Sequence, residues 1–95
     1  MPTLEDIAAA LRSDLCVCKT LDDGTGVVLD LGSSRVLALN ATGMFLVEEL
    51  IQRAGSLGDL TEALTTHFEV DRATAERDVR ELVADLGRHL VPQAD

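Results

Sequence analysis

Aromatic residues are nearly absent from this chain of 95 residues, which has two phenylalanines, Phe45 and Phe68, and no tryptophan or tyrosine. A hydrophobic core must therefore be built from leucine, valine, alanine and isoleucine. The same scarcity removes the aromatic platforms on which many proteins stack nucleic-acid bases and sugars. Ligands of those classes are poor candidates for this chain.

Positive charge is also scarce. Eight Lys and Arg residues oppose 17 Asp and Glu residues, which gives a formal net charge of -9. A protein with this balance repels the phosphates of nucleic acids and anionic membrane surfaces. No run of residues approaches the roughly 20 apolar residues of a membrane span, and the first residues lack the pattern of a signal peptide. We therefore expect a cytoplasmic protein that binds neither nucleic acid nor a membrane.

Cysteine occurs twice, as Cys16 and Cys18. We predict that they lie in a strand with their side chains on opposite faces, so that they remain reduced thiols without a disulfide between them. His67 and His89 do not have the spacing that would complete a zinc site with them. The sequence therefore predicts no metal and no cofactor.

Groups for catalysis are missing from the pattern as well. The sequence shows no histidine beside a nucleophile and no glycine loop of the kind that binds phosphate. Asp22 and Asp23 fall in an expected turn, where aspartate bonds its own backbone, and Gly24 and Gly26 are explained by the same turn. We expect no catalytic activity.

Three short runs of β-type residues are present, at residues 15–21, 27–31 and 35–39. The segments between them are short and contain Asp23-Gly24 and Gly32-Ser33, residues that tolerate the positive φ angles of tight turns. The pattern predicts an antiparallel meander of three strands.

After Leu39 the apolar period changes from two to about 3.6, which predicts helices. Asn40 is the expected N-cap of a helix running to about Ala54, Ser56 and Asp59 form the capping box of a second helix, and Asp71 caps a third that Pro92 ends. The predicted inward residues are Leu46, Val47, Leu50, Ile51 and Ala54 in the first helix, Leu57, Leu60, Ala63, Leu64 and Phe68 in the second, and Ala75, Val79, Leu82, Val83, Leu86 and Leu90 in the third.

The predicted architecture is α+β: a three-stranded antiparallel β-meander followed by three α-helices, similar to a winged helix-turn-helix. A meander is not stable alone, so the helices must cover one of its faces. We assign residues 15–92 to this domain and residues 1–14 to a lead-in, which is either a short amphipathic helix or a loosely packed segment. The third strand remains at the edge of the sheet.

A family resemblance follows from the run G-V-V-L-D-L-G-S-S-R-V-L-A-L-N-A-T-G and from the later run D-L-T-E-A-L-T-T-H-F-E-V-D-R-A-T-A-E-R-D-V-R-E-L-V-A-D-L. These runs resemble the PqqD-like proteins, recognition elements for ribosomally made, post-translationally modified peptides. The resemblance covers about residues 15–90. Its most specific part is Leu39-Asn40-x-Thr42-Gly43, which matches the family's L-N-x-T-G.

The chain departs from the family pattern at three positions. Many relatives carry aromatic residues in the third strand and a tryptophan in the helix that follows it. This chain has Val36, Leu37 and Val47 there.

The resemblance implies that the leader segment of a precursor peptide adds as an antiparallel strand to the third strand and lies against the last helix. A free strand edge offers main-chain donors and acceptors, and a helix beside it offers pockets for side chains. We predict that Leu37 and Leu39 border the groove from beneath, while Val36 and Ala38 point the other way. The predicted peptide-binding residues are Ser34, Arg35, Val36, Leu37, Ala38 and Leu39 on the strand and Val79, Arg80, Leu82, Val83 and Leu86 on the helix.

The predicted function is that of a non-catalytic, chaperone-like scaffold, which holds the leader peptide for a separate maturation enzyme. In the families that this chain resembles, such enzymes include radical S-adenosylmethionine enzymes and the leader proteases and cyclases of lasso-peptide pathways. Arg77, Arg80 and Arg88 would suit an acidic leader, and a solvated helix surface explains them equally.

Two other functions remain open from the sequence. A winged-helix regulator would place its last helix in the major groove of DNA, although the mixed charges of that helix disfavour it. A general protein-interaction adaptor would use the same exposed edge strand with a different partner.

Overall fold

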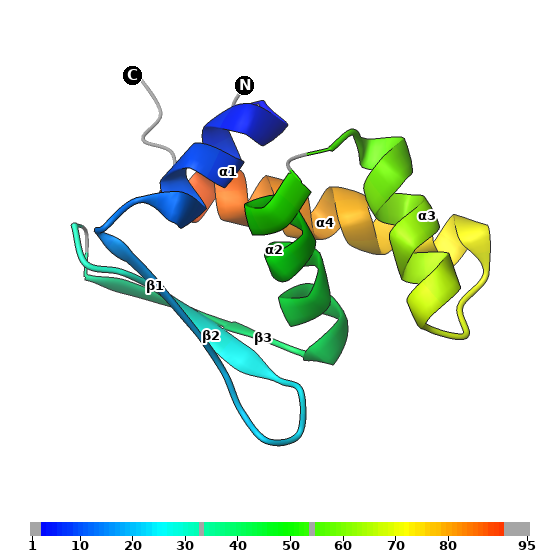
Figure 1. Cartoon of the computed structure of the whole chain (residues 1–95), viewed down its shortest axis with the longest axis horizontal. Helices are drawn as coiled ribbons and strands as arrows, with labels where there is room; N and C mark the ends of the chain where they lie inside the picture. The colour runs from blue at the N-terminus through cyan, green and yellow to red at the C-terminus, as the bar shows by residue number, and fades with distance from the viewer. Residues whose placement is uncertain (1–2, 33, 54, 91–95) are drawn as a thin grey trace.

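The computed structural model describes residues 3–32, 34–53 and 55–90. Its elements follow the order that the sequence predicts, and the lead-in forms a helix, one of its two predicted alternatives (Figure 1). They are α1 (Leu4–Arg12), β1 (Cys16–Thr20), β2 (Gly26–Asp30), β3 (Arg35–Leu39), α2 (Ala41–Arg53), α3 (Leu57–His67) and α4 (Arg72–Leu90). The α+β class and the three-stranded meander are confirmed.

The lead-in forms a helix that belongs to the main core. Thr3 and Asp6 make a reciprocal capping box at the start of α1. The backbone N–H of Thr3 donates to Asp6 Oδ2 at 3.0 Å, and the backbone N–H of Asp6 donates to Thr3 Oγ1 at 3.1 Å. Ile7 and Leu11 are buried in the same core cluster as residues of the sheet and of α4. Arg12 Nε donates to the carbonyl oxygen of Ile51 at 2.7 Å, which fixes α1 to the end of α2.

The sheet has the order β1-β2-β3, with both neighbouring pairs antiparallel. In the first turn, Gly24 adopts φ +88°, as the sequence predicts. In the second turn, the positive φ falls on Ser34, at +59°, rather than on Gly32. Ser33, the other residue predicted to take this conformation, lies outside the described residues.

The prediction that the two cysteines point to opposite faces is wrong. Residues two apart in a strand share a face, and Cys16 and Cys18 both lie half-buried against the core. Both thiols are free. Burial, reinforced by the neighbouring Cys18, raises the pKa of Cys16 to about 12, so its thiol stays protonated near neutral pH.

The predicted helix caps are confirmed. Asn40 Oδ1 accepts from the N–H of Gly43 at 2.8 Å at the start of α2, and Asp71 Oδ2 accepts from the N–H of Thr74 at 3.2 Å at the start of α4. Ser56 and Asp59 form the capping box of α3. The predicted helix end at Ala54 and the stop at Pro92 lie outside the described residues.

The core contains the apolar stripes of all three later helices, with one error in the prediction. Leu57 is 42% exposed at the first position of α3. Thr61, one turn later, is buried instead. Its hydroxyl donates to the carbonyl oxygen of Leu57 at 2.8 Å, so the buried hydroxyl keeps a hydrogen-bond partner. Met44, which the stripe of α2 omitted, is buried.

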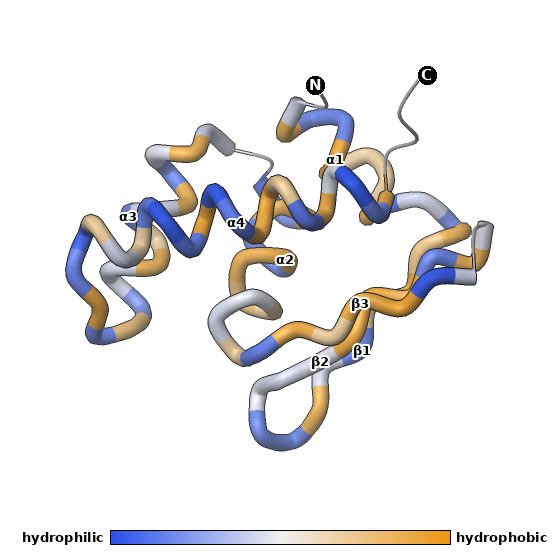
Figure 2. Tube along the Cα trace, turned by 180° about the vertical axis from the view of Figure 1, so that it is seen from behind, coloured by the Kyte–Doolittle hydropathy of each residue, from blue (hydrophilic) through white to orange (hydrophobic). Residues whose placement is uncertain are grey.

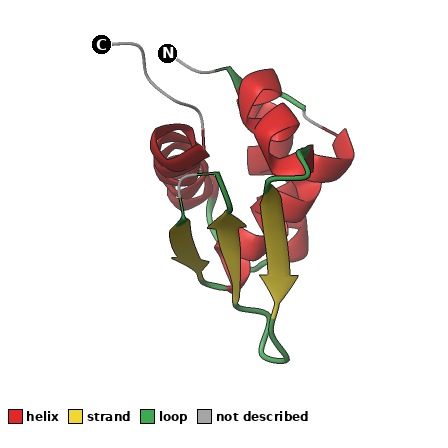
Figure 3. Cartoon of the chain, turned by 90° about the vertical axis from the view of Figure 1, so that its left-hand side faces the viewer, coloured by secondary structure: helices red, strands yellow, loops and turns green. Residues whose placement is uncertain are grey.

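The helices cover one face of the sheet, and the other face is left open (Figure 3). Colouring by hydropathy shows apolar residues along the strands and an alternation of apolar and polar residues along α4 (Figure 2). The strand register aligns Val17, Leu29 and Val36 across the open face, where Val17 is 46% and Val36 61% exposed. Within the described residues, no helix combines the length and the apolar character of a membrane span.

Candidate functional site

β3 lies at one edge of the sheet, because β2 is its neighbour on one side and no described strand pairs with it on the other. An unpaired edge is a template for a further strand. The hydrogen bonds between β1 and β2 determine which main-chain groups of β3 face outward.

Two bonds fix the alternation between β1 and β2. The N–H of Leu31 donates to the carbonyl of Leu15, and the N–H of Leu21 donates to the carbonyl of Thr25, both at 2.7 Å. In an antiparallel pair, hydrogen-bonded and non-bonded residue pairs alternate. The odd-numbered residues of β2 therefore bond to β1, and its even-numbered residues bond to β3.

The register of β2 and β3 shows which residues of β3 face the free edge. Arg35, Leu37 and Leu39 stand opposite even-numbered residues of β2, so their N–H and C=O groups are used within the sheet. Val36 and Ala38 direct their N–H and C=O groups to the free edge. The side chains of these two residues are exposed, whereas Leu37 and Leu39 are half-buried against the core, as predicted.

A groove of about 240 Å³ lies between the end of β3, the start of α2 and the middle of α4. It brings together three predicted residues, Ala38, Leu39 and Leu82. Leu37, which was predicted to border the groove, is not among its lining residues, whereas Ala38, which was predicted to point away from it, is. Leu46 and Leu82 give it an apolar floor, and carboxylates from α4 form its rim. Its lining residues are Ala38, Leu39, Asn40, Thr42, Gly43, Leu46, Asp78, Glu81, Leu82 and Asp85.

Several predicted residues of α4 do not reach this groove. Val79 and Leu86 are 1% and 0% exposed and belong to the core, and Val83 is half-buried against it. Arg80 is exposed and borders a separate hollow on the α3 side of the helix, beside Leu57. Most of the apolar stripe predicted for α4 is thus the buried face of the helix, and Leu82 is its member that lines the groove.

On α4, three residues line the groove that the prediction did not include: Asp78, Glu81 and Asp85. They recur at spacings of three and four, and each comes one residue before a member of the apolar stripe of α4. This spacing places them on one side of α4. The signal is present in the sequence, but it becomes meaningful only when the position of β3 beside α4 is known.

Two of these carboxylates have counter-ions on their own helix. Asp78 Oδ1 lies 3.8 Å from Arg77 Nε, and Asp85 pairs with Arg88. Glu81 is exposed and makes no ion pair with any described residue. Arg77 and Arg88 are therefore explained by intrahelical pairing, which weakens the expectation that they meet an acidic leader.

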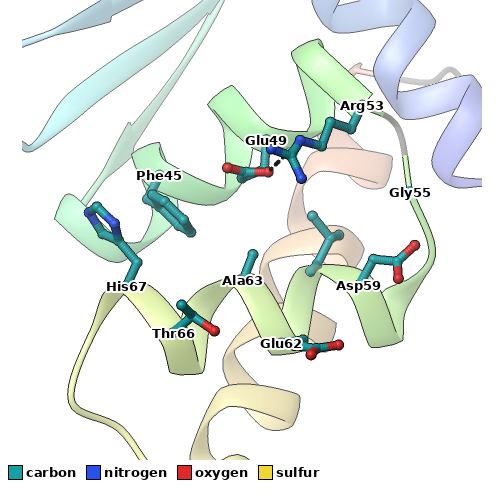
Figure 4. Close-up of a pocket in the computed structure, with 10 residues that line it drawn as sticks. Phe45, Glu49, Arg53, Gly55, Asp59, Glu62, Ala63, Thr66 and His67 are labelled. Carbon is teal, nitrogen blue, oxygen red and sulfur yellow. Dashed lines mark ion pairs between the residues drawn. The ribbon is translucent and has the colours of Figure 1, made fainter.

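A second cavity, of about 640 Å³, lies between α2 and α3 (Figure 4). At one end the rings of Phe45 and His67 stack, with centroids 4.4 Å apart, and at the other Arg53 Nε lies 3.6 Å from Glu49 Oε2. No lining residue comes from the sheet or from α4. Within the described residues, no group of histidine, cysteine or acidic side chains is placed to hold a metal ion.

Comparison with known proteins identifies relatives of this arrangement. The family model described as Coenzyme PQQ synthesis protein D (PqqD) matches residues 25–90. The structure "TbiB1 in Complex with the TbiA(beta) Leader Peptide" is 29% identical with a TM-score of 0.67, and the match covers 87% of this chain and 96% of that one.

A second solved structure, "Lasso peptide synthetase B1 complexed with the leader peptide", is 32% identical, also with a TM-score of 0.67. The match covers 82% of this chain and 89% of that one. No curated protein sequence matches.

Proposed function

Because this chain belongs to the PqqD family, we propose that it captures the leader segment of a ribosomally made precursor peptide and has no catalytic role of its own. The observation that carries this proposal is the free edge of β3, in a fold shared with two proteins whose structures contain a leader peptide. The predicted peptide-binding strand, Ser34 to Leu39, remains the centre of the proposed site.

The leader adds to β3 as an antiparallel fourth strand. Its backbone bonds the N–H and C=O groups of Val36 and Ala38, which gives affinity that depends little on sequence. Alternate side chains of the added strand point to the helix side of the sheet, where the groove floor of Leu46 and Leu82 receives them. Selectivity comes from these side chains and from the groove.

Chemistry is left to a separate maturation enzyme. Binding of the leader raises the effective concentration of the rest of the precursor at that enzyme. The lasso peptide synthetase among the structural relatives favours a leader protease or a cyclase over a radical S-adenosylmethionine enzyme. The proposed location is the cytoplasm, where ribosomes make the precursor.

The open face of the sheet is the proposed contact with this enzyme. Val17, Leu29 and Val36 form an apolar row there that none of the described helices covers. Exposed apolar patches of this kind are typical of protein interfaces. The row reaches β3, so an enzyme seated on it would lie beside the bound leader.

The alternative of DNA binding gains no support. The side of α4 beside the sheet carries Asp78, Glu81 and Asp85, which would repel a phosphate backbone. A general adaptor that uses the edge of β3 differs from the proposed function only in its partner, and binding to a leader peptide separates the two.

The test is calorimetric titration of the protein with the leader peptide of the precursor encoded beside its gene. We expect sequence-dependent binding in the micromolar range or tighter, with no binding of a scrambled leader or of duplex DNA. Val36→Pro removes an outward N–H but no bond to β2, because proline is tolerated where the N–H of an edge strand faces solvent. It should weaken binding about tenfold.

Val36→Thr is the matched control, since it alters the same side chain but keeps the N–H donor. It should bind nearly as well as the wild type. Circular dichroism of both variants verifies that the fold is kept. Equal affinity of a folded Val36→Pro variant and the wild type would contradict strand addition on β3.

A further inference from the structure

The charged side chains that line the groove beside β3 are all acidic. Asp78, Glu81 and Asp85 line it where Ala38 and Leu39 end the strand. Arg35, the cation of β3, stands at the strand's first residue, four positions away, which is roughly 13 Å along an extended chain. The acidic part of the proposed peptide site is therefore the part beside Ala38 and Leu39.

The negative end is not fully neutralised by the protein itself. Three carboxylates face two nearby guanidiniums, those of Arg77 and Arg88, which leaves one net negative charge. The arginine side chains of both pairs are 66% exposed, so water and salt weaken them as counter-ions. Glu81 has no ion-pair partner among the described residues, so its exposed carboxylate is available to a cationic side chain of a bound peptide.

The lining of the groove suits a long cationic side chain. Leu46 and Leu82 are buried beneath it and offer an apolar surface to a methylene stem. Lysine and arginine commonly lay their stems on such surfaces and keep the charged group in a polar rim. Here the rim is formed by the three carboxylates of α4.

We propose that this groove selects leader peptides with a lysine or arginine in the N-terminal half of the segment that adds to β3. The inference rests on the proposed function. An antiparallel strand places its N-terminal residues beside Ala38 and Leu39 and its C-terminal residues beside Arg35. The side chain that enters the acidic groove must therefore come from the N-terminal half of the segment.

The first test is fluorescence polarisation with the leader peptide of the neighbouring precursor, labelled and titrated with protein at low and moderate salt. Neutralising the basic residue of the leader, or changing Glu81→Gln, should weaken binding about two- to fivefold at low salt. The difference should shrink as salt is raised. Glu62→Gln on α3, a carboxylate of the separate α2–α3 cavity, is the control and should leave binding unchanged.

The decisive arm is a charge exchange. Glu81→Lys should weaken binding of the native leader further, and replacing the leader's basic residue with glutamate should restore affinity to that variant alone. A leader without a basic residue in this segment, or equal binding to the wild type and to Glu81→Lys, would overturn the inference while leaving leader capture intact. A leader that does not bind the wild type at all would overturn both proposals.

Discussion

At the scale of single residues, Gly26 shows what the sequence could and could not predict. The sequence explains it as a turn glycine, but the structure places it as the first residue of β2. A Cβ atom there would lie 2.5 Å from the carbonyl oxygen of Lys19 and 2.7 Å from Met44 Cγ. Glycine is required because the backbone of β1 and the side chain of Met44 on α2 both approach this position closely, which no local pattern reveals.

Gly26→Ala should therefore lower the free energy of unfolding by about 1–3 kcal/mol, the usual cost of overpacking a core. Gly58→Ala is the control, because its Cβ would meet nothing closer than Ser56 Oγ at 3.6 Å and alanine favours a helix. That variant should be neutral or stabilised by up to about 1 kcal/mol. Urea denaturation followed by circular dichroism measures both, and equal stability of the two variants would refute this packing argument.

At the scale of elements, the sequence was informative wherever the signal was local. The alternation in residues 35–39 predicted the inward and outward faces of β3, and the caps at Asn40, Ser56 and Asp71 predicted the starts of three helices. The sequence did not show whether the helix α1 would pack against the rest of the domain. Thr3 marked a helix start, but burial of that helix depends on contacts with α2 and α4, which are distant in sequence.

The open face of the sheet yields a prediction at this scale. Val17→Glu adds a charge to an exposed position on β1, away from the edge of β3, so the fold and leader binding should be unaffected. Removal of the leader by the partner protease should slow at least tenfold, because a charge would be buried without a partner at the interface. Val17→Thr should have a smaller effect. Unchanged processing by the Glu variant would exclude this face as the enzyme contact.

At the scale of the whole molecule, accessibility separates the helix residues predicted for the site from those that line the groove. Val79 and Leu86 have the right spacing to face a peptide, but the packing of α4 onto the other helices buries them and leaves Asp78, Glu81 and Asp85 beside the strand. Periodicity identifies an apolar stripe on a helix; it does not reveal which neighbouring element lies along each border of the stripe. The free edge of β3 could be predicted from the order of the strands, whereas the acidic border of α4 beside it could not.

The most direct test of leader capture by strand addition is amide hydrogen exchange, measured by NMR with and without the leader peptide. The amides of Val36 and Ala38 face the free edge and should exchange quickly in the free protein and slowly in the complex. Leu37 should change much less and serves as an internal control, because its N–H already bonds to β2. Unchanged exchange at Val36 and Ala38, with new protection confined to the α2–α3 cavity, would contradict the proposed binding mode.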